Sequence, residues 1–207
     1  MPVMPMFPLG SVLLPGGVMP LHVFEPRYRQ MVIDCLLQDG VPEFGQVLIS
    51  HGSEAGGGDD RELVGTVAAM QQLNALDSRR YAFNAVGTRR IRVIEWLDDD
   101  PYPVAEVDDW PDVTCDANEV AQPIAEAERR VRAALSMAQQ LDMVEFDPTE
   151  IVIQDEPIAA SYQLAAMAPI GPADRFRLLA AAGPQERLAM LAEILEDVEA
   201  MLKFRLS

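Results

Sequence analysis

The sequence of 207 residues contains a single lysine, Lys203, beside 15 arginines. A phosphate-binding loop of the Walker A type ends in Gly-Lys-Ser or Gly-Lys-Thr, and no such segment occurs. A Ser-Lys peptidase dyad or a Schiff-base lysine has only Lys203 to draw on. The scarcity of lysine therefore argues against ATP hydrolysis and against two kinds of covalent catalysis.

Histidine and cysteine are equally scarce, with two residues of each. His22 lies inside an apolar run and reads as structural, whereas His51 opens a glycine-rich loop. No Gly-x-Ser-x-Gly, His-Glu-x-x-His or Cys-x-x-Cys spacing occurs, so we expect no catalytic residue, no metal and no cofactor. Cys35 and Cys115 are far apart in the sequence and fit a reducing compartment, which favours a cytoplasmic location.

Long apolar runs and excess positive charge are also missing. No stretch of 18 apolar residues occurs, so no membrane span is expected. Acidic residues number 33 against 16 basic ones, for a net charge of −17, which repels nucleic acids and acidic membrane surfaces. The one basic concentration, Arg79 to Arg92, flanks Gly87, where we expect a hairpin turn. It is either a phosphate-binding patch or a set of partners for the surrounding acids.

Near residue 113 the sequence changes from short apolar runs separated by Gly, Pro and Asp to apolar residues at helical spacing. This change predicts a β-rich domain over 1–113 and a helical domain over 114–207. One helix is predicted in the first domain, from Pro26 to Gly40. Prolines interrupt the apolar stretch at the N-terminus, so this stretch does not suggest a signal peptide. The predicted strands are 12–14, 21–24, 44–50, 63–76, 81–86, 91–97 and 104–107, with a flexible loop at 51–61.

The second domain shows helical periodicity, with prolines placed as first-turn residues. They are Pro123, Pro157, Pro172 and Pro184. Apolar residues fall on one stripe in the first and last of these four helices. The stripes are Ile124, Ala127, Val131, Leu135, Ala138 and Leu141, and Leu188, Leu191, Leu195, Val198 and Leu202. We expect both stripes to pack inside a helical bundle.

Several segments in order resemble the N-terminal domain of the Lon ATP-dependent proteases. They are Met6–Leu9, Leu14–Tyr28, Phe44–Leu48, Val64–Ala68, Val86–Val93 and Pro101–Val107. The resemblance implies an α+β fold: a PUA-like curled antiparallel β-domain with one helix, followed by a C-terminal helical bundle. It also implies a substrate-recognition domain in stand-alone form, without the ATPase and Ser-Lys peptidase of the full-length enzymes.

These observations favour a non-catalytic module that binds unfolded or extended apolar protein segments, acting with a separate protease or chaperone. The Pro15–Gly17 turn would present Leu14 and Met19 on a rigid loop, and nearby sheet edges would accept an extended peptide. Both side chains could instead belong to the core. The alternatives are an RNA-binding protein, since PUA-like folds include RNA binders, and an enzyme with an unrecognised site between the halves. The charge disfavours the first, and the lack of reactive side chains the second.

Overall fold

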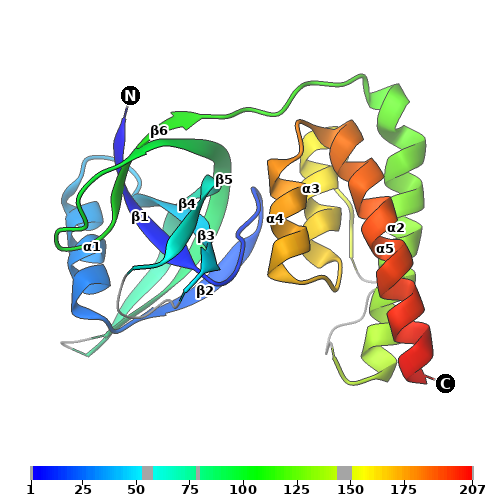
Figure 1. The fold of residues 1–207 in the computed structure, drawn as a ribbon, viewed down its shortest axis with the longest axis horizontal. Coiled ribbons are helices and arrows are strands. Elements are labelled where there is room, and N and C mark those ends of the chain that lie inside the picture. The colour runs from blue at the N-terminus through cyan, green and yellow to red at the C-terminus, as the bar shows by residue number, and fades with distance from the viewer. Residues whose placement is uncertain (1, 53–57, 78–79, 144–150, 207) are drawn as a thin grey trace. The chain divides into compact units, whose positions relative to one another are not determined.

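The computed structural model describes residues 2–52, 58–77, 80–143 and 151–206 and divides the chain into two compact units, Met1–Pro111 and Asp112–Ser207. We call them the β unit and the helical unit. The predicted boundary at residue 113 lies two residues beyond this division. Figure 1 labels the helices and strands of both units.

The described residues of the β unit form one helix and six strands, and the strands run in the order β2-β5-β4-β3-β1-β6 across the sheet. They are β1 (Val3–Leu9), β2 (Val18–Val23), α1 (Pro26–Leu37), β3 (Glu43–His51), β4 (Asp60–Asp77), β5 (Arg80–Trp96) and β6 (Val104–Asp109). Because β5 pairs with β6 as well as with β2 and β4, the sheet curls back on itself. This arrangement confirms the predicted α+β fold and its strongly curled sheet.

Strand β1 was not predicted, because prolines interrupt its sequence. Residues Val3–Pro5 pair with β6 and residues Met6–Leu9 pair with β3, so each half of β1 has one recorded strand neighbour. A strand paired on one side tolerates a residue without an N–H group. The pairing with β3 is parallel, so the sheet is mixed rather than purely antiparallel as predicted.

Two further predictions in the β unit were wrong. Residues 12–14 form no strand, although all three side chains are buried. Gly87 makes no hairpin turn, because β5 continues through it from Arg80 to Trp96. The glycine is needed instead for a close approach: a Cβ atom at this position would lie 2.3 Å from the carbonyl oxygen of Leu14. The centre of the predicted loop, 53–57, lies outside the described residues.

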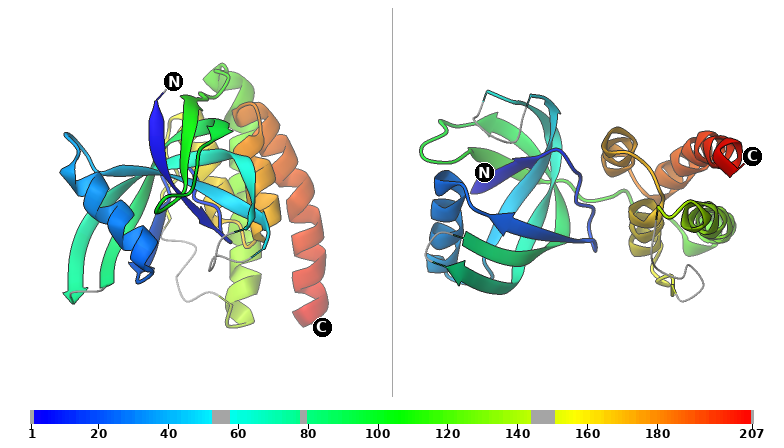
Figure 2. Two further views of the ribbon diagram at one scale, coloured as in Figure 1. Left: turned by 60° about the vertical axis from the view of Figure 1, so that its left-hand side comes forward. Right: turned by 90° about the horizontal axis from the view of Figure 1, so that it is seen from below.

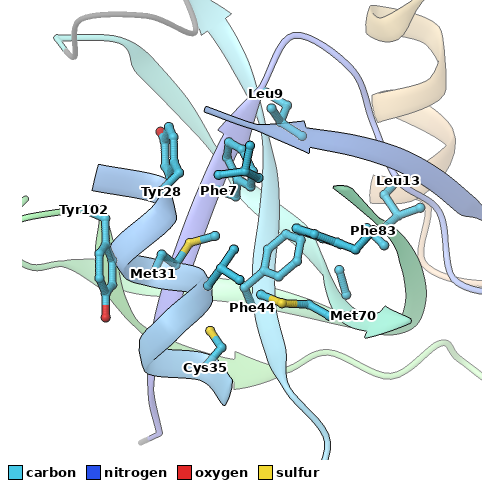
Figure 3. Packing of buried hydrophobic residues seen from close by; sticks show 14 residues of the cluster. Phe7, Leu9, Leu13, Tyr28, Met31, Cys35, Phe44, Met70, Phe83 and Tyr102 are labelled. Carbon is cyan, nitrogen blue, oxygen red and sulfur yellow. The ribbon is translucent and has the colours of Figure 1, made fainter. Parts of the chain in front are cut away.

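Two clusters of buried side chains form the core of the β unit. The larger one contains five buried aromatic side chains, among them Phe7 stacked on Tyr28 with ring centroids 4.1 Å apart (Figure 3). Helix α1 contributes Met31 and Cys35 to the same cluster. The Cys35 thiol donates to the carbonyl oxygen of Glu43, and burial raises its pKa to about 12. The helix predicted from Pro26 is thus confirmed, and it packs its Met31 and Cys35 side chains into the core.

The helical unit contains α2 (Ala117–Gln140), α3 (Pro157–Met167), α4 (Pro172–Ala180) and α5 (Pro184–Leu206). Helices α2 and α5 lie side by side, as the views of Figure 2 show. Most of both predicted stripes is buried, as expected, while Ile124, Leu141 and Val198 are only partly buried. Pro157, Pro172 and Pro184 begin their helices as predicted. Pro123 lies inside α2, which begins six residues earlier, where the Asp116 carboxylate accepts from the Asn118 N–H.

Candidate functional site: the Leu14–Gly17 turn and strand β2

The turn at Leu14–Gly17 is a rigid feature of the β unit. The Gly17 N–H donates to the Leu14 carbonyl at 2.9 Å, and Gly16 has a φ of +78°. Proline followed by a residue with positive φ is the sequence requirement of a type II turn. Gly16 N–H donates to the Gly87 carbonyl, and the Gly87 N–H donates to the Gly17 carbonyl. The turn is therefore bonded directly to β5 and leads straight into β2.

Gln46 of β3 fixes the segment that precedes the turn. Its side-chain oxygen accepts from the Leu13 N–H at 2.9 Å, and its amide nitrogen donates to the Ser11 carbonyl at 2.7 Å. The side chain is 1% exposed, so these bonds satisfy backbone groups that are shielded from water. Residues 11–17 are thus held to the sheet at two places, by Gln46 and by Gly87.

The two residues singled out by sequence have different environments. Leu14 is 2% exposed and points into the protein, so it supports the turn and offers little surface to a ligand. Met19 on β2 is partly buried against the larger core cluster, and its sulfur accepts from the Ser11 hydroxyl at 3.7 Å. No observation tests whether either residue binds a peptide, so that role stays a prediction.

Two exposed apolar residues, one at each end of β2, were not singled out from the sequence. Val18 is 60% exposed and Phe24 is 67% exposed. They flank Pro20 and His22, which are also exposed, whereas Met19 and Leu21 pack against the core. The alternation of the two sets along β2 is the signal that could have identified Val18 as an outward-facing residue.

The arginines near Gly87 are engaged inside the β unit. Arg89 pairs with Glu43 and Asp109, at 3.0 and 2.9 Å. Arg90 is 3% exposed, and its Nε donates to the Trp110 carbonyl. Arg90 and Arg92 both stack on the Trp110 ring, 4.1 and 4.3 Å from its centroid. Arg79 lies outside the described residues. These contacts indicate that the arginines bind acidic side chains, carbonyl groups and an aromatic ring of the protein itself, rather than forming a phosphate-binding patch.

A shallow depression of about 400 Å³ lies near the start of β4, lined by Asp59, Asp60, Arg61, Leu63 and Trp96. Arg61 donates to Asp59 at 2.8 Å and to Asp99 at 2.5 Å, and lies over the Trp96 ring. Burial is the largest single influence on Asp59 and opposes its ionisation. Its hydrogen bonds, first that from Arg61, together with the charges of Arg61 and Arg27 outweigh burial and lower the pKa of the carboxyl group. The charges in this depression are therefore largely engaged with one another.

The described residues contain no group of three or more His, Cys, Asp or Glu side chains placed to hold a metal ion. Both histidines are exposed, and neither donates to or accepts from a serine or cysteine in any recorded hydrogen bond. Within the same residues, no helix is both long and apolar enough to cross a bilayer. The candidate site is therefore the exposed, largely apolar strand β2 together with the Leu14–Gly17 turn that precedes it.

A family model and two relatives found by comparison with known proteins all point to the same family. A family model described as the ATP-dependent protease La (LON) substrate-binding domain matches residues 3–197. Lon protease 2 of Myxococcus xanthus is 34% identical over 118 residues, which is 56% of this chain and 14% of the relative. Lon protease of Anaeromyxobacter dehalogenans is 32% identical over 108 residues, covering 51% of this chain and 13% of the relative. The matched segments thus span about a seventh of these relatives.

Solved structures agree in fold over nearly the whole chain. A Lon N-terminal domain protein from Xanthomonas campestris is 26% identical with a TM-score of 0.66, and the match covers 93% of this chain and 98% of that one. The N-terminal domain of the Mycobacterium avium complex Lon protease is 17% identical with a TM-score of 0.68, over 95% and 99%. This second likeness shows the fold alone. The family model matches most of the chain, which therefore belongs to the LON substrate-binding domain family.

Proposed function

We propose, from the membership of this chain in the LON substrate-binding domain family, that it is a non-catalytic module that binds protein substrates in extended or unfolded form. The observation that carries the proposal is the exposed apolar strand β2, which continues from the Leu14–Gly17 turn. A turn fixed by Gln46 and Gly87 loses little conformational entropy on binding, so a small contact area gives measurable affinity.

The residues that contact the client are Met19, its exposed neighbour Val18, and Phe24 beyond the far end of β2, while Leu14 acts by holding the turn in place. This division follows from burial, because Leu14 is 2% exposed and Phe24 is 67% exposed. The occupied arginines around Gly87 and the net charge of −17 weigh against RNA as the partner. A separate protease or chaperone would receive the bound client.

The test measures binding of the chain to a chemically denatured client protein by fluorescence anisotropy. We expect Met19→Ser and Phe24→Ser to weaken binding about tenfold, the effect of about 1.4 kcal/mol in binding free energy. Leu37→Ser is the matched control, because Leu37 is 80% exposed on α1 of the same unit. Equal affinity in wild type, Met19→Ser and Phe24→Ser would contradict the proposed surface.

Leu14→Ala tests the claim that Leu14 holds the turn in place and does not contact the client. We expect it to lower the free energy of unfolding by about 2–5 kcal/mol, because it empties a buried site. Urea unfolding monitored by circular dichroism measures this loss. If Leu14→Ala leaves the stability unchanged and weakens client binding, Leu14 is a contact residue and the assignment is wrong.

A further inference from the structure

Strand β2 has an open edge. It pairs with β5 in one unbroken register from Val18 opposite Val86 to Val23 opposite Tyr81. Among the described residues, β2 has no second strand neighbour, and no other recorded hydrogen bond involves the backbone of residues 18–23. Pro20 fits this position, since proline in a sheet is confined to edges and bulges. The unpaired N–H and C=O groups form a template for another strand.

The second half of β4 offers a poorer template. Its pairing with β5 shifts register between Gln71 and Asn74 and again beyond Ala75, and Gln72 has a φ of +51°. Such irregularities twist a strand and disrupt its ladder, which discourages addition of a further strand. Near the start of this half, the Met70 N–H already donates to the Pro42 carbonyl. Of the two edges, only that of β2 is regular.

We propose that the open edge of β2 binds a client segment as an added β-strand. The inference rests on the proposed function and specifies how that site recognises its substrate. Backbone hydrogen bonds to β2 supply affinity that does not depend on the client's sequence. The same bonds require an extended segment without proline at the paired positions.

The two faces of β2 set the side-chain pattern of the client. Met19 and Leu21 are only partly buried against the larger core cluster. A strand laid beside β2 places every second side chain next to them, where apolar groups complete the packing. The remaining side chains lie on the outer face with Val18 and His22. The site therefore selects segments with apolar residues at alternate positions.

Charge narrows the client class further. Residues 1–111 hold 16 acidic and eight basic residues, a net charge of −8. The exposed residues of β2 and its end, Val18, Pro20, His22 and Phe24, carry no acidic or permanently charged group to bind a counter-ion. The surrounding negative potential repels acidic segments and attracts basic ones. The expected client is thus extended, alternately apolar, and neutral or basic.

The experiment compares two short peptides of equal composition and equal small positive charge, titrated against the full chain. One alternates apolar and polar residues, and the other groups its apolar residues at helical spacing. We expect the alternating peptide to bind about tenfold more tightly. N-methylation of one alternate set of its residues should weaken binding by a similar factor, while N-methylation of the other set has little effect.

Hydrogen exchange locates the contact, with the alternating peptide expected to protect amides within residues 18–24 and not those within 71–77. Val18→Lys should weaken binding of this peptide about tenfold. The matched control is Leu37→Lys, which adds the same charge at another exposed apolar position.

Three outcomes would overturn the proposal. Equal affinity for both peptides with no effect of N-methylation leaves client binding intact but excludes strand addition. Binding of neither the peptides nor a denatured client removes the proposed function as well. Protection of residues 18–24 that increases with protein concentration alone assigns the edge to a second copy of this chain.

Discussion

Among the described residues, the β unit and the helical unit each bury one arginine, and the two residues are stabilised differently. Arg187 on α5 is fully buried and donates to Asp112, to the Ser161 hydroxyl at 2.8 Å and to the Leu178 carbonyl at 3.0 Å. Arg90 on β5 is 3% exposed and donates to the carbonyl oxygens of Trp110 and Pro111. Arg187 is therefore paired with a buried carboxylate, whereas Arg90 is held by backbone carbonyl groups and an indole ring.

Both arginines hold the segment that joins the units, each within its own unit. Arg90 fixes Trp110 and Pro111, the last residues of the β unit. Arg187 fixes Asp112, the first residue of the helical unit, while the Val113 N–H donates to the Ala182 carbonyl. Adjacent residues at the boundary are therefore held by two anchors, Arg90 on one side and Arg187 on the other.

The largest expected effect is that of Asp112→Ala. It leaves the Arg187 charge buried without its carboxylate and removes the acceptor of the Tyr162 hydroxyl, so we expect a loss of about 3–5 kcal/mol in the free energy of unfolding. Urea unfolding measures the loss. Asp108→Ala, at an exposed site near the end of β6, should change the stability by less than about 0.5 kcal/mol. Equal effects of the two substitutions would show that the buried ion pair adds nothing.

The double variant Asp112→Leu with Arg187→Met sharpens this result. Replacing both partners of a buried ion pair by apolar groups is often neutral or stabilising, so much of the lost stability should return. Failure to recover any stability would mean that the neutral partners, Ser161 and the Leu178 carbonyl, carry most of the interaction.

Arg90→Met should have an intermediate effect. The variant leaves two backbone carbonyls without their donor and removes one of the two cations stacked on Trp110, and we expect a loss of about 1–3 kcal/mol. Unfolding monitored by tryptophan fluorescence measures it. A loss of stability equal to that of Asp112→Ala would mean that the arginine without a carboxylate partner matters as much as the one with it.

The smallest expected effect concerns Asp59 in the β unit. Its pKa is lower in the folded state than in the unfolded state, so the unfolded state binds more protons and stability falls as pH falls through the folded-state pKa. Asp59→Asn should therefore reduce the dependence of the urea midpoint on pH between about 5 and 3. An unchanged pH dependence would mean that Arg61 gives this carboxyl group no extra stability in its ionised form.

The sequence predicted most elements because their signals are local. The apolar faces of α1, α2 and α5 repeat at helical spacing, and four prolines mark true helix starts: Pro26, Pro157, Pro172 and Pro184. The turn predicted at Gly87 was wrong, because a glycine required for close approach looks the same in sequence as one required for a turn. Strand β1 was missed since its tolerance of Pro5 and Pro8 depends on which side each half is paired.

The candidate site was only partly predictable for the same physical reason. The Pro15–Gly16 turn signal is local and was identified. The burial of Leu14 depends on contacts with residues far away in the sequence, among them Gly87. The Arg187–Asp112 pair joins residues 75 positions apart, and no local pattern reveals it.

The environment of Cys35 has a practical consequence for thiol chemistry. Its pKa of about 12 leaves almost no thiolate at neutral pH, and its side chain is fully buried, so alkylating reagents should not reach it in the folded protein. Cys115 is only partly buried, three residues beyond Asp112. Desolvation and the nearby acids Glu119, Glu156 and Asp116 raise its pKa as well, so it should react slowly. The folded chain should accept one maleimide, next to the junction of the two units, and so carries its own attachment point for a spectroscopic probe of that junction.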